Sequence, residues 1–281
     1  MFAEMFPTPK PLIMGILNAT PDSFSDGGLF ADPECATHHA MEMARQGADI
    51  IDVGGESTRP GAAPVSASEQ IARVVPVIEA LRQTLPDTVV ISIDTSLAEV
   101  AAAALAAGAA LINDVTAGLG DPTLFALAAE RNVPIILMHM QGNPRTMQDN
   151  PHYVDVVKEV IDFLLERSAA AQAVGIAKGK IIFDPGIGFG KRKEDNLTLL
   201  ANLGCFAATG YVTLLGTSRK RFMGAVCNET RPRELVAATV ATTAVGVMAG
   251  INIFRVHDIR ENRQAADVAY AVKQAQNSII I

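Results

Sequence analysis

The stretch LVAATVATTAVGVMAGINIF, residues Leu235–Phe254, contains no charged residue over 20 positions. Its length would allow a membrane-spanning helix, but it is rich in Ala, Thr and Gly. Gly250 stands where a helix would end, and Ile251–Phe254 has the apolar residues of a short strand. We therefore interpret the stretch as a helix followed by a buried strand, and we expect no membrane partner.

The same pairing of a short apolar strand with a helix recurs along the chain. Eight runs rich in Ile, Val and Leu are typical of strands buried on both faces, at Leu12–Leu17, Ala48–Val53, Thr88–Ile93, Ala110–Asn113, Pro134–His139, Ile181–Phe183, Val212–Leu215 and Asn252–Val256. Helical patterns separate them, at Pro33–Gln46, Ser66–Leu85, Ser96–Ala107, Pro122–Arg131, Tyr153–Val174, Glu194–Leu203, Pro232–Ala249 and Ile259–Gln276.

Eight strand–helix units without a break in composition predict an α/β fold, a single (β/α)₈ TIM barrel domain over residues 1–281. A doubly wound sheet is the alternative, but it would have fewer units and a strong motif at its switch point. Two long loops, Asn18–Asp32 and Gly54–Val65, follow the first two strands. Both lie at the strand ends where barrels of this class carry their active sites.

Composition limits the partners and the compartment. The net charge of −7 and the pI of about 5.3 argue against nucleic acid, which requires a basic face. The three cysteines, Cys35, Cys205 and Cys227, lie far apart in the sequence, and the N-terminal segment lacks the basic start and apolar run of a signal peptide. We expect a cytoplasmic protein.

A polar residue follows almost every predicted strand. The series consists of Asn18, Asp52, Asp94, Asn113 with Asp114, His139, Asp184, Ser218 with Lys220, and Arg255 with His257. A closed barrel would gather these strand ends at one mouth. Each Asp, Asn or Ser could instead cap a helix. Cations are poor N-caps, however, so the series as a whole favours a site.

The charges in this region divide by position. Carboxylates follow the second, third, fourth and sixth strands, whereas the last two strands are followed by Arg219, Lys220, Arg221, Arg255 and His257. The loops after the last two strands of such barrels commonly hold phosphate, so the cations predict a phosphate-bearing small molecule. A solvated helix start is the alternative for Arg219–Arg221. The carboxylates suit a ligand with paired N–H donors, such as the guanidine-like edge of a heterocycle.

The segment DPGIGFGK, Asp184–Lys191, matches neither of the common phosphate-binding loops. Its glycines do not follow G-x-G-x-x-G, and Arg192 stands where a P-loop needs Ser or Thr. Taken alone, the segment indicates only that the backbone passes close to another group after the sixth strand.

Eight segments together resemble the dihydropteroate synthase family. Two of them are long: MGILNATPDSFSDGG at Met14–Gly28 and DVGGESTRPG at Asp52–Gly61. Shorter matches follow in order at Ser92–Thr95, Asn113–Asp114, Met138–Gly142, Asp184–Lys191, Ser218–Lys220 and Arg255–Asp258. The resemblance implies a homodimeric transferase that joins p-aminobenzoate to 6-hydroxymethyl-7,8-dihydropterin diphosphate, with Mg²⁺, in folate biosynthesis.

The resemblance also implies roles for individual residues. It places the pterin against Asp94, Asn113, Asp184 and Lys220. It places Asn18 at the metal, and it places the diphosphate near Thr58, Arg255 and His257. Arg59 would lie on the second long loop, and the p-aminobenzoate pocket would be walled by Pro60, Phe189 and Lys220. The implied catalytic residues are Asp94, Asp184, Lys220, Arg255 and His257.

The implied chemistry suits these residue types. An aniline nitrogen is neutral near pH 7, so expelling diphosphate is the difficult step. Arg255, His257 and Mg²⁺ would stabilise the charge on the leaving oxygens, and Asp94 and Asp184 would favour the cationic methylene carbon. We therefore expect a dissociative substitution, with the two long loops closing over the site.

Four positions depart from the family pattern. Arg221 stands where a Ser or Thr commonly touches the p-aminobenzoate carboxylate, so Arg221 either pairs with the carboxylate itself or points to solvent. Ala19 replaces a more usual Val, and we have no account of the extra charge at Arg192 and Lys193. A pterin-binding paralogue without turnover and a pterin-dependent methyltransferase remain the rival hypotheses. Neither of these needs the diphosphate cluster.

Overall fold

In the computed structural model, which describes residues 10–19, 33–56, 65–142 and 146–278, eight parallel strands close into one barrel. Each strand pairs with the next one along the chain, and the last pairs with the first. The strands are β1 (Leu12–Asn18), β2 (Ile50–Gly54), β3 (Val90–Asp94), β4 (Leu111–Asp114), β5 (Ile135–Met138), β6 (Ile181–Asp184), β7 (Val212–Leu215) and β8 (Ile253–Val256). The eight predicted strands and the predicted barrel are confirmed.

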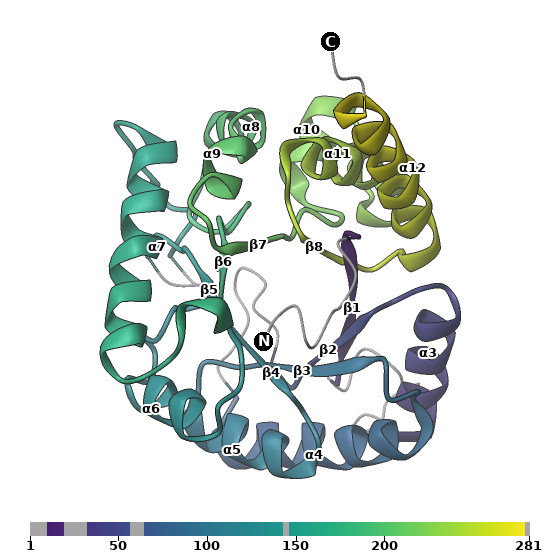
Figure 1. Cartoon of the computed structure of the whole chain (residues 1–281), viewed down its shortest axis with the longest axis vertical. Coiled ribbons are helices and arrows are strands. Elements are labelled where there is room, and N and C mark those ends of the chain that lie inside the picture. The colour runs from purple at the N-terminus through teal and green to yellow at the C-terminus, as the bar shows by residue number, and fades with distance from the viewer. Residues whose placement is uncertain (1–9, 20–32, 57–64, 143–145, 279–281) are drawn as a thin grey trace.

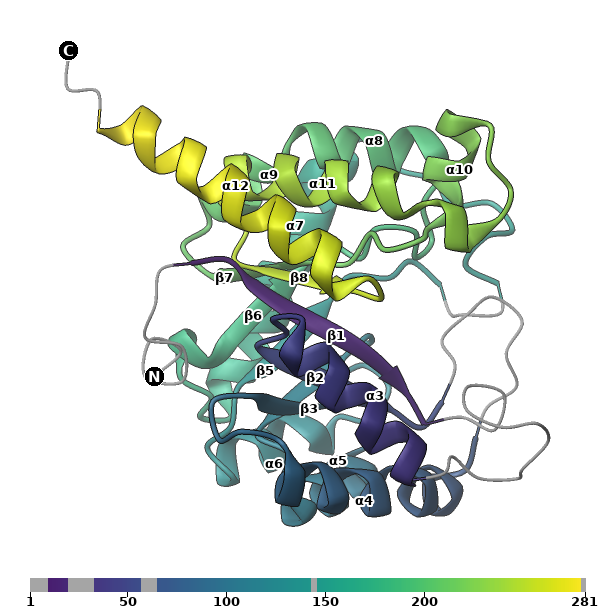
Figure 2. The same ribbon diagram turned by 90° about the vertical axis from the view of Figure 1, so that its right-hand side faces the viewer.

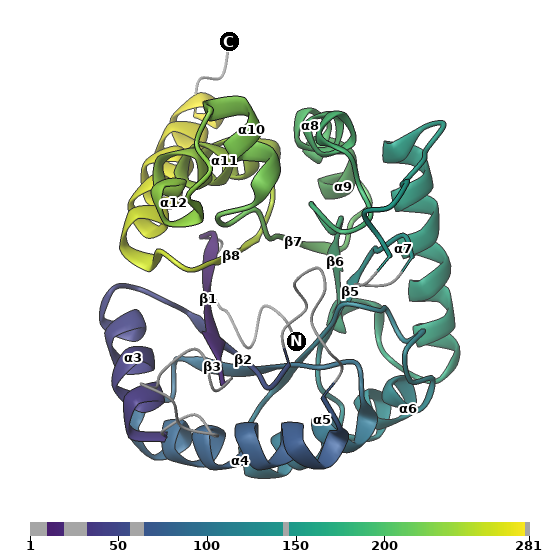
Figure 3. The same ribbon diagram turned by 180° about the vertical axis from the view of Figure 1, so that it is seen from behind.

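Helices surround the strands on all sides (Figures 1 and 3). They are α3 (Pro33–Arg45), α4 (Ala67–Thr84), α5 (Ala98–Ala107), α6 (Thr123–Glu130), α7 (Val156–Ala173), α8 (Lys193–Ala201), α9 (Leu203–Ala207), α10 (Arg221–Cys227), α11 (Val236–Ala249) and α12 (Ile259–Asn277). Side-chain caps begin two of them: Ser66 accepts from the Glu69 amide at 3.3 Å and Asp155 from the Lys158 amide at 3.1 Å.

Three helix predictions need correction. The single helix predicted at Glu194–Leu203 is interrupted at Asn202, where α8 ends and α9 begins. Asn202 leaves the helical conformation, and its side-chain amide donates to the Thr198 carbonyl at 2.8 Å. The short helix α10 follows Lys220 directly and was not predicted. Pro232 begins a 3₁₀ turn, and α11 starts only at Val236.

The uncharged stretch Leu235–Phe254 contains all of α11 and the first half of β8. Gly250 ends the helix in the left-handed conformation, with φ of +98°, and β8 begins at Ile253. Within the described part of the chain, no helix has the length and apolarity needed to cross a membrane. The interpretation as a helix followed by a strand is confirmed.

Two apolar layers hold the barrel together. The outer layer lies between strands and helices and includes Phe183, which stacks on Tyr211 with ring centroids 4.0 Å apart. The inner layer fills the barrel itself and takes buried residues from seven of the eight strands, namely Leu12, Met14, Ile50, Leu111, Ile136, Ile182, Leu214 and Ile253. The floor of the barrel is therefore solid, as is usual for this fold.

Candidate active site

A polar layer lies directly above the apolar floor, and strand geometry explains why. Side chains on a strand alternate between its two faces, so a residue two positions after a floor residue also points into the barrel. Ile50 is followed in this way by Asp52, Leu111 by Asn113, Ile182 by Asp184 and Ile253 by Arg255. The strands run toward the side of the molecule on which α10 lies (Figure 2). The polar layer is thus at their carboxyl ends.

Arg255 is at the centre of a hydrogen-bonded network in this layer. Its Nε donates to Oδ2 of Asp52 at 2.7 Å, and its Nη2 donates to Oδ2 of Asp94 at 2.7 Å. The side-chain amide of Asn113 donates to the same Asp52 oxygen at 3.0 Å. Asp52 is completely buried. Arg255 of β8 therefore bonds to side chains of β2 and β3, and β4 joins the network through Asp52.

Asp184, Phe189 and Lys220 form the neighbouring part of the site. The Gly186 amide donates to Oδ1 of Asp184 at 2.7 Å. The ammonium of Lys220 lies 4.5 Å from the centroid of the Phe189 ring and donates to the carbonyl of Ile187. Loops that follow β6 and β7 therefore present an aromatic ring, a cation and a carboxylate together.

Burial shifts the pKa values of the ionisable groups in this cavity. Burial raises the pKa of Asp94 to about 7, although Arg255 opposes the shift. Burial also raises the pKa of Asp184, which Lys220 and Arg255 both oppose. The pKa of Lys220 falls to about 8, mainly because the ammonium is buried. Asp184 interacts electrostatically with Lys220 and with Arg255, so these predicted site residues share one interior.

The loops after β7 and β8 are joined by two side-chain contacts. The Ser218 hydroxyl lies 2.9 Å from Nδ1 of His257 and accepts from the His257 amide at 3.1 Å. Arg219 forms a two-point ion pair with Asp258, its Nε donating to Oδ2 at 3.0 Å. The cationic cluster predicted from the sequence is therefore smaller than expected, because Asp258 balances the charge of Arg219. Arg221 is exposed at the first position of α10.

Two residues of the strand-end series face away from the mouth. His139 follows inward-facing Met138 and therefore points to the helix layer, where its ring meets Phe163 edge-on at 4.9 Å. Asp114 follows inward-facing Asn113, and its carboxylate caps the next turn by accepting from the Thr116 amide at 2.8 Å. Asp114 therefore caps a turn and not a helix, and the helix-cap alternative is wrong for Asp94, which pairs with Arg255.

The remaining predicted residues fall at the edge of the described site. Asn18 is the last residue of β1 and is half-buried. It lies four residues after Met14 on the same strand, so its side chain is on the same, inward face. Thr58, Arg59 and Pro60 lie outside the described residues. Asp52 is the residue that the sequence argument left without a role. Its position two residues after Ile50 is the signal that could have found it.

Comparisons with known proteins agree with this arrangement. A family model described as "Pterin binding enzyme" matches residues 14–257. The dihydropteroate synthase of Synechocystis sp. is 44% identical over 96% of this chain and 97% of its own length. That of Escherichia coli K12 is 46% identical over 95% and 94%. A solved Xanthomonas albilineans dihydropteroate synthase with 4-aminobenzoic acid superposes with a TM-score of 0.87 at 46% identity, covering 94% of this chain and 93% of that one.

The family match spans most of the chain, two relatives match it over nearly their full length, and a solved member superposes on its barrel. The chain therefore belongs to the dihydropteroate synthase family of pterin-binding enzymes.

Proposed function

We propose that the protein joins p-aminobenzoate to 6-hydroxymethyl-7,8-dihydropterin diphosphate and that the polar layer of the barrel carries the reaction. The aniline nitrogen bonds to the methylene carbon and loses a proton, while the carbon–oxygen bond to diphosphate breaks. Diphosphate leaves and 7,8-dihydropteroate forms. The observation that carries this assignment is the convergence of Asp94, Asn113, Asp184, Lys220 and Arg255 above one apolar floor.

The pterin ring suits the acceptors of this layer. Asp94 and Asp184 are buried carboxylates at the ends of β3 and β6, and a pterin offers N–H donors to such groups. Asn113 already donates its amide N–H to Asp52, so its amide oxygen is the atom that would accept from the ring. As carbon–oxygen cleavage makes the methylene cationic, the two carboxylates would favour the charge delocalised into the ring.

The leaving diphosphate would lie toward Arg255 and His257, with Thr58 beside it. Asp52 and Asp94 balance the charge of Arg255, so this residue would serve chiefly as a fixed hydrogen-bond donor. His257 is oriented by Ser218 and points into the barrel by the same alternation as Arg255. Removing one such contact should slow the reaction by about 10²–10³-fold.

Mg²⁺ is the metal ion we propose, with Asn18 as its protein ligand. The half-buried amide oxygen of Asn18 at the end of β1 is the hard oxygen donor that Mg²⁺ prefers. Among the described residues, no three His, Cys, Asp or Glu side chains gather as a metal site, so diphosphate and water would supply the other ligands. When bound, Mg²⁺ would neutralise charge on the leaving group.

The p-aminobenzoate pocket would be formed by Phe189 and the stem of Lys220, with Pro60 closing it. The Phe189 ring and the Lys220 ammonium are already in contact in the protein. An aromatic ring beside an ammonium can pack against an aryl acid and attract its carboxylate. Arg221 is exposed at the start of α10.

One assay tests the proposal. The protein is mixed with the pterin diphosphate, p-aminobenzoate and Mg²⁺, and release of diphosphate and formation of dihydropteroate are followed. We expect both products in equal amounts over many turnovers. Tight pterin binding without product would instead support a binding protein, and methyl transfer from a methylated pterin would support the methyltransferase alternative.

We also propose a cytoplasmic homodimer. Cys205 and Cys227 are exposed free thiols, which suits a reducing compartment. The helix α11 packs Thr239, Thr243 and Val247 inward and exposes Val245, which is 52% accessible, so a second subunit could cover this outer face. Light scattering should give a mass near twice that of the chain, and Val245→Glu should lower it if α11 lies in the interface.

A further inference from the structure

The carbonyls of the turn after β6, residues 186–190, are held by side chains, three of them distant in sequence and one from Lys191, which directly follows the turn. Its own backbone supplies one hydrogen bond, from the Phe189 amide to the Gly186 carbonyl at 3.1 Å. All five carbonyls of the turn accept from side chains, and the donors are Lys191 Nζ to Gly186 at 2.9 Å and Phe189 at 3.1 Å, Lys220 Nζ to Ile187, Gln148 Nε2 to Gly188 at 2.8 Å, and the Tyr153 hydroxyl to Gly190 at 2.7 Å.

The glycines of the turn explain why side chains are needed. Gly186, Gly188 and Gly190 have φ of +65°, +83° and +59°, in the left-handed region. Three alternating left-handed residues prevent both a helix and a strand ladder, yet buried carbonyls must find donors. A Cβ on Gly190 would lie 2.3 Å from the Gln141 carbonyl, so the turn also lies directly against the loop after β5.

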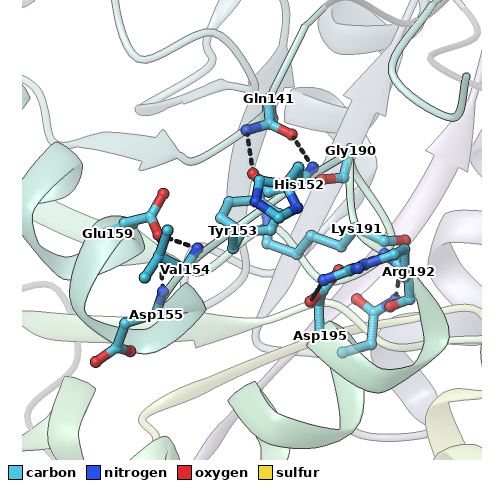
Figure 4. Close-up of polar contacts among 11 residues, drawn as sticks. Gln141, His152, Tyr153, Val154, Asp155, Glu159, Gly190, Lys191, Arg192 and Asp195 are labelled. Atoms are coloured by element: carbon cyan, nitrogen blue, oxygen red, sulfur yellow. Dashed lines mark hydrogen bonds and ion pairs between the residues drawn. The ribbon is translucent and has the colours of Figure 1, made fainter. Parts of the chain in front are cut away.

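The loop after β5 is itself held in place by hydrogen bonds from Gln141. Gln141 forms two hydrogen bonds of 3.0 Å with the backbone of His152, one from its amide to the carbonyl and one from the His152 amide to its oxygen (Figure 4). These hydrogen bonds bring the next residue, Tyr153, under Gly190. The buried ammonium of Lys191 completes the join through Nδ1 of His139 at 2.9 Å.

We propose that Tyr153 and Lys191 are positioning residues for the aryl amine substrate, acting through the 186–190 turn. The inference rests on the proposed function, in which the Phe189 ring and Lys220 bound the p-aminobenzoate pocket. Tyr153 is 7% accessible and Lys191 is 3% accessible, so we expect both to act through the turn and not by direct contact with the substrate. Their hydrogen bonds fix the backbone that carries Phe189 and the carbonyl that holds Lys220.

The chemical consequence is a split between the two substrates. The turn contacts the proposed pterin-binding groups at its near end, where the Gly186 amide donates to Asp184 and the Ile187 carbonyl accepts from Lys220. Asp52, Asp94 and Arg255 bond to one another and not to the turn, and Tyr153 holds the far end at Gly190, so pterin diphosphate should still bind when that far end loosens. The pocket for the aryl amine would then be less ordered. Its residues would lose more conformational entropy when the amine binds, so the affinity for the amine would fall. Affinity for p-aminobenzoate is therefore the quantity that reports on the turn.

Tyr153→Phe and Gln148→Met test the proposal at two different carbonyls. Each removes one donor and little volume, and neither adds a charge. We expect the KM for p-aminobenzoate to rise about three- to tenfold in Tyr153→Phe, with kcat and the KM for pterin diphosphate changed less than twofold. Gln148→Met should show the same split. The matched control is Tyr211→Phe, whose hydroxyl contacts Ser168 at 2.8 Å in the helix layer and which should leave all three constants unchanged.

Three outcomes would be informative. A raised KM for p-aminobenzoate alone supports the positioning role. Unchanged constants in Tyr153→Phe, or equal losses for both substrates, would overturn it, because a general loss of structure affects both substrates alike. A wild-type protein that binds pterin but forms no dihydropteroate would overturn the proposed function itself, and this inference with it.

Discussion

Arg255 and Asp94, 161 residues apart in sequence, form an ion pair of 2.7 Å between Nη2 and Oδ2 inside the barrel. The same guanidinium also contacts Asp52 at 2.7 Å. Two buried carboxylates thus depend on one arginine, and breaking a buried pair costs more than the pair contributes, since an uncompensated charge is left behind. Arg255 is therefore a structural residue of the polar layer as well as a proposed catalytic one.

Replacing Arg255 should accordingly damage stability and catalysis together. Arg255→Ala should lower the free energy of unfolding by about 3–5 kcal/mol and kcat/KM by about 10²–10³-fold. Urea unfolding and steady-state kinetics measure the two effects. The double variant Arg255→Ala with Asp52→Asn removes one orphaned charge, so it should recover part of the stability and none of the turnover. Wild-type kinetics in Arg255→Ala would exclude a leaving-group role.

The rate should have a maximum in pH near neutrality. Because the pKa of Asp94 is raised to about 7, this carboxylate takes up a proton as the pH falls through 7 and can no longer accept from the pterin in its charged form. Because the pKa of Lys220 is lowered to about 8, its ammonium loses charge as the pH rises through 8. A plot of kcat/KM against pH should therefore fall on both sides of the interval from about 7 to 8.

Lys220→Arg separates the two limbs of that profile. Arginine stays charged throughout the range, so the alkaline limb should move upward in pH while the acid limb stays in place. If the variant turns over slowly, the affinity for the pterin diphosphate can be followed across the same pH range. An alkaline limb that does not move would assign it to a group other than Lys220.

The fold was predictable because each strand is a short apolar run followed by a helix pattern. The misjudged elements lacked such a signal. α10 is only seven residues long, too short for a clear helical period, and a helix start at Arg219–Arg221 is only an alternative on the sequence. Asn202 interrupts a helical pattern by bonding its side chain to Thr198, a competition that periodicity does not reveal.

The sequence predicted which strand ends carry the site residues, but it did not predict which of these side chains form hydrogen bonds or ion pairs with one another. The alternation of faces, applied from Ile50, Leu111 and Ile136, would have selected Asp52 and Asn113 and excluded His139. The partners themselves required coordinates. Nothing in the sequence shows that Arg255 bonds to Asp52, or that Asp258 balances the charge of Arg219 and so removes one cation from the cluster.

His139 should make the fold sensitive to mild acid. Burial and the nearby Lys191 lower the pKa of His139 from its ordinary value of 6.5 to about 3. The folded state therefore binds fewer protons than the unfolded state, so the contribution to stability is complete above pH 6.5 and is lost as the pH falls toward 3. In this pH range one such group makes the free energy of unfolding depend on pH by up to about 1.4 kcal/mol per pH unit, and His139→Gln should remove that dependence.

Denaturant unfolding at several pH values measures this effect. Wild type and His139→Gln are compared first at pH 7.5, where the neutral amide can still accept from Lys191, and then at pH 6, 5 and 4. The free energy of unfolding of the wild type should fall more steeply than that of the variant. Parallel curves would show that His139 does not supply the acid sensitivity.

Gly186 should tolerate no side chain, because the turn after β6 lies directly against the end of β5. A Cβ at this position would lie 1.9 Å from the His139 carbonyl oxygen, and φ is +65°. Gly186→Ala should therefore lower the free energy of unfolding by about 4 kcal/mol or more. Gly179→Ala is the matched control, since a Cβ there meets nothing within 4 Å, and it should change stability by less than about 1 kcal/mol. Similar unfolding midpoints for the two variants would mean that the turn can withdraw from His139, and the close approach would then have no structural role.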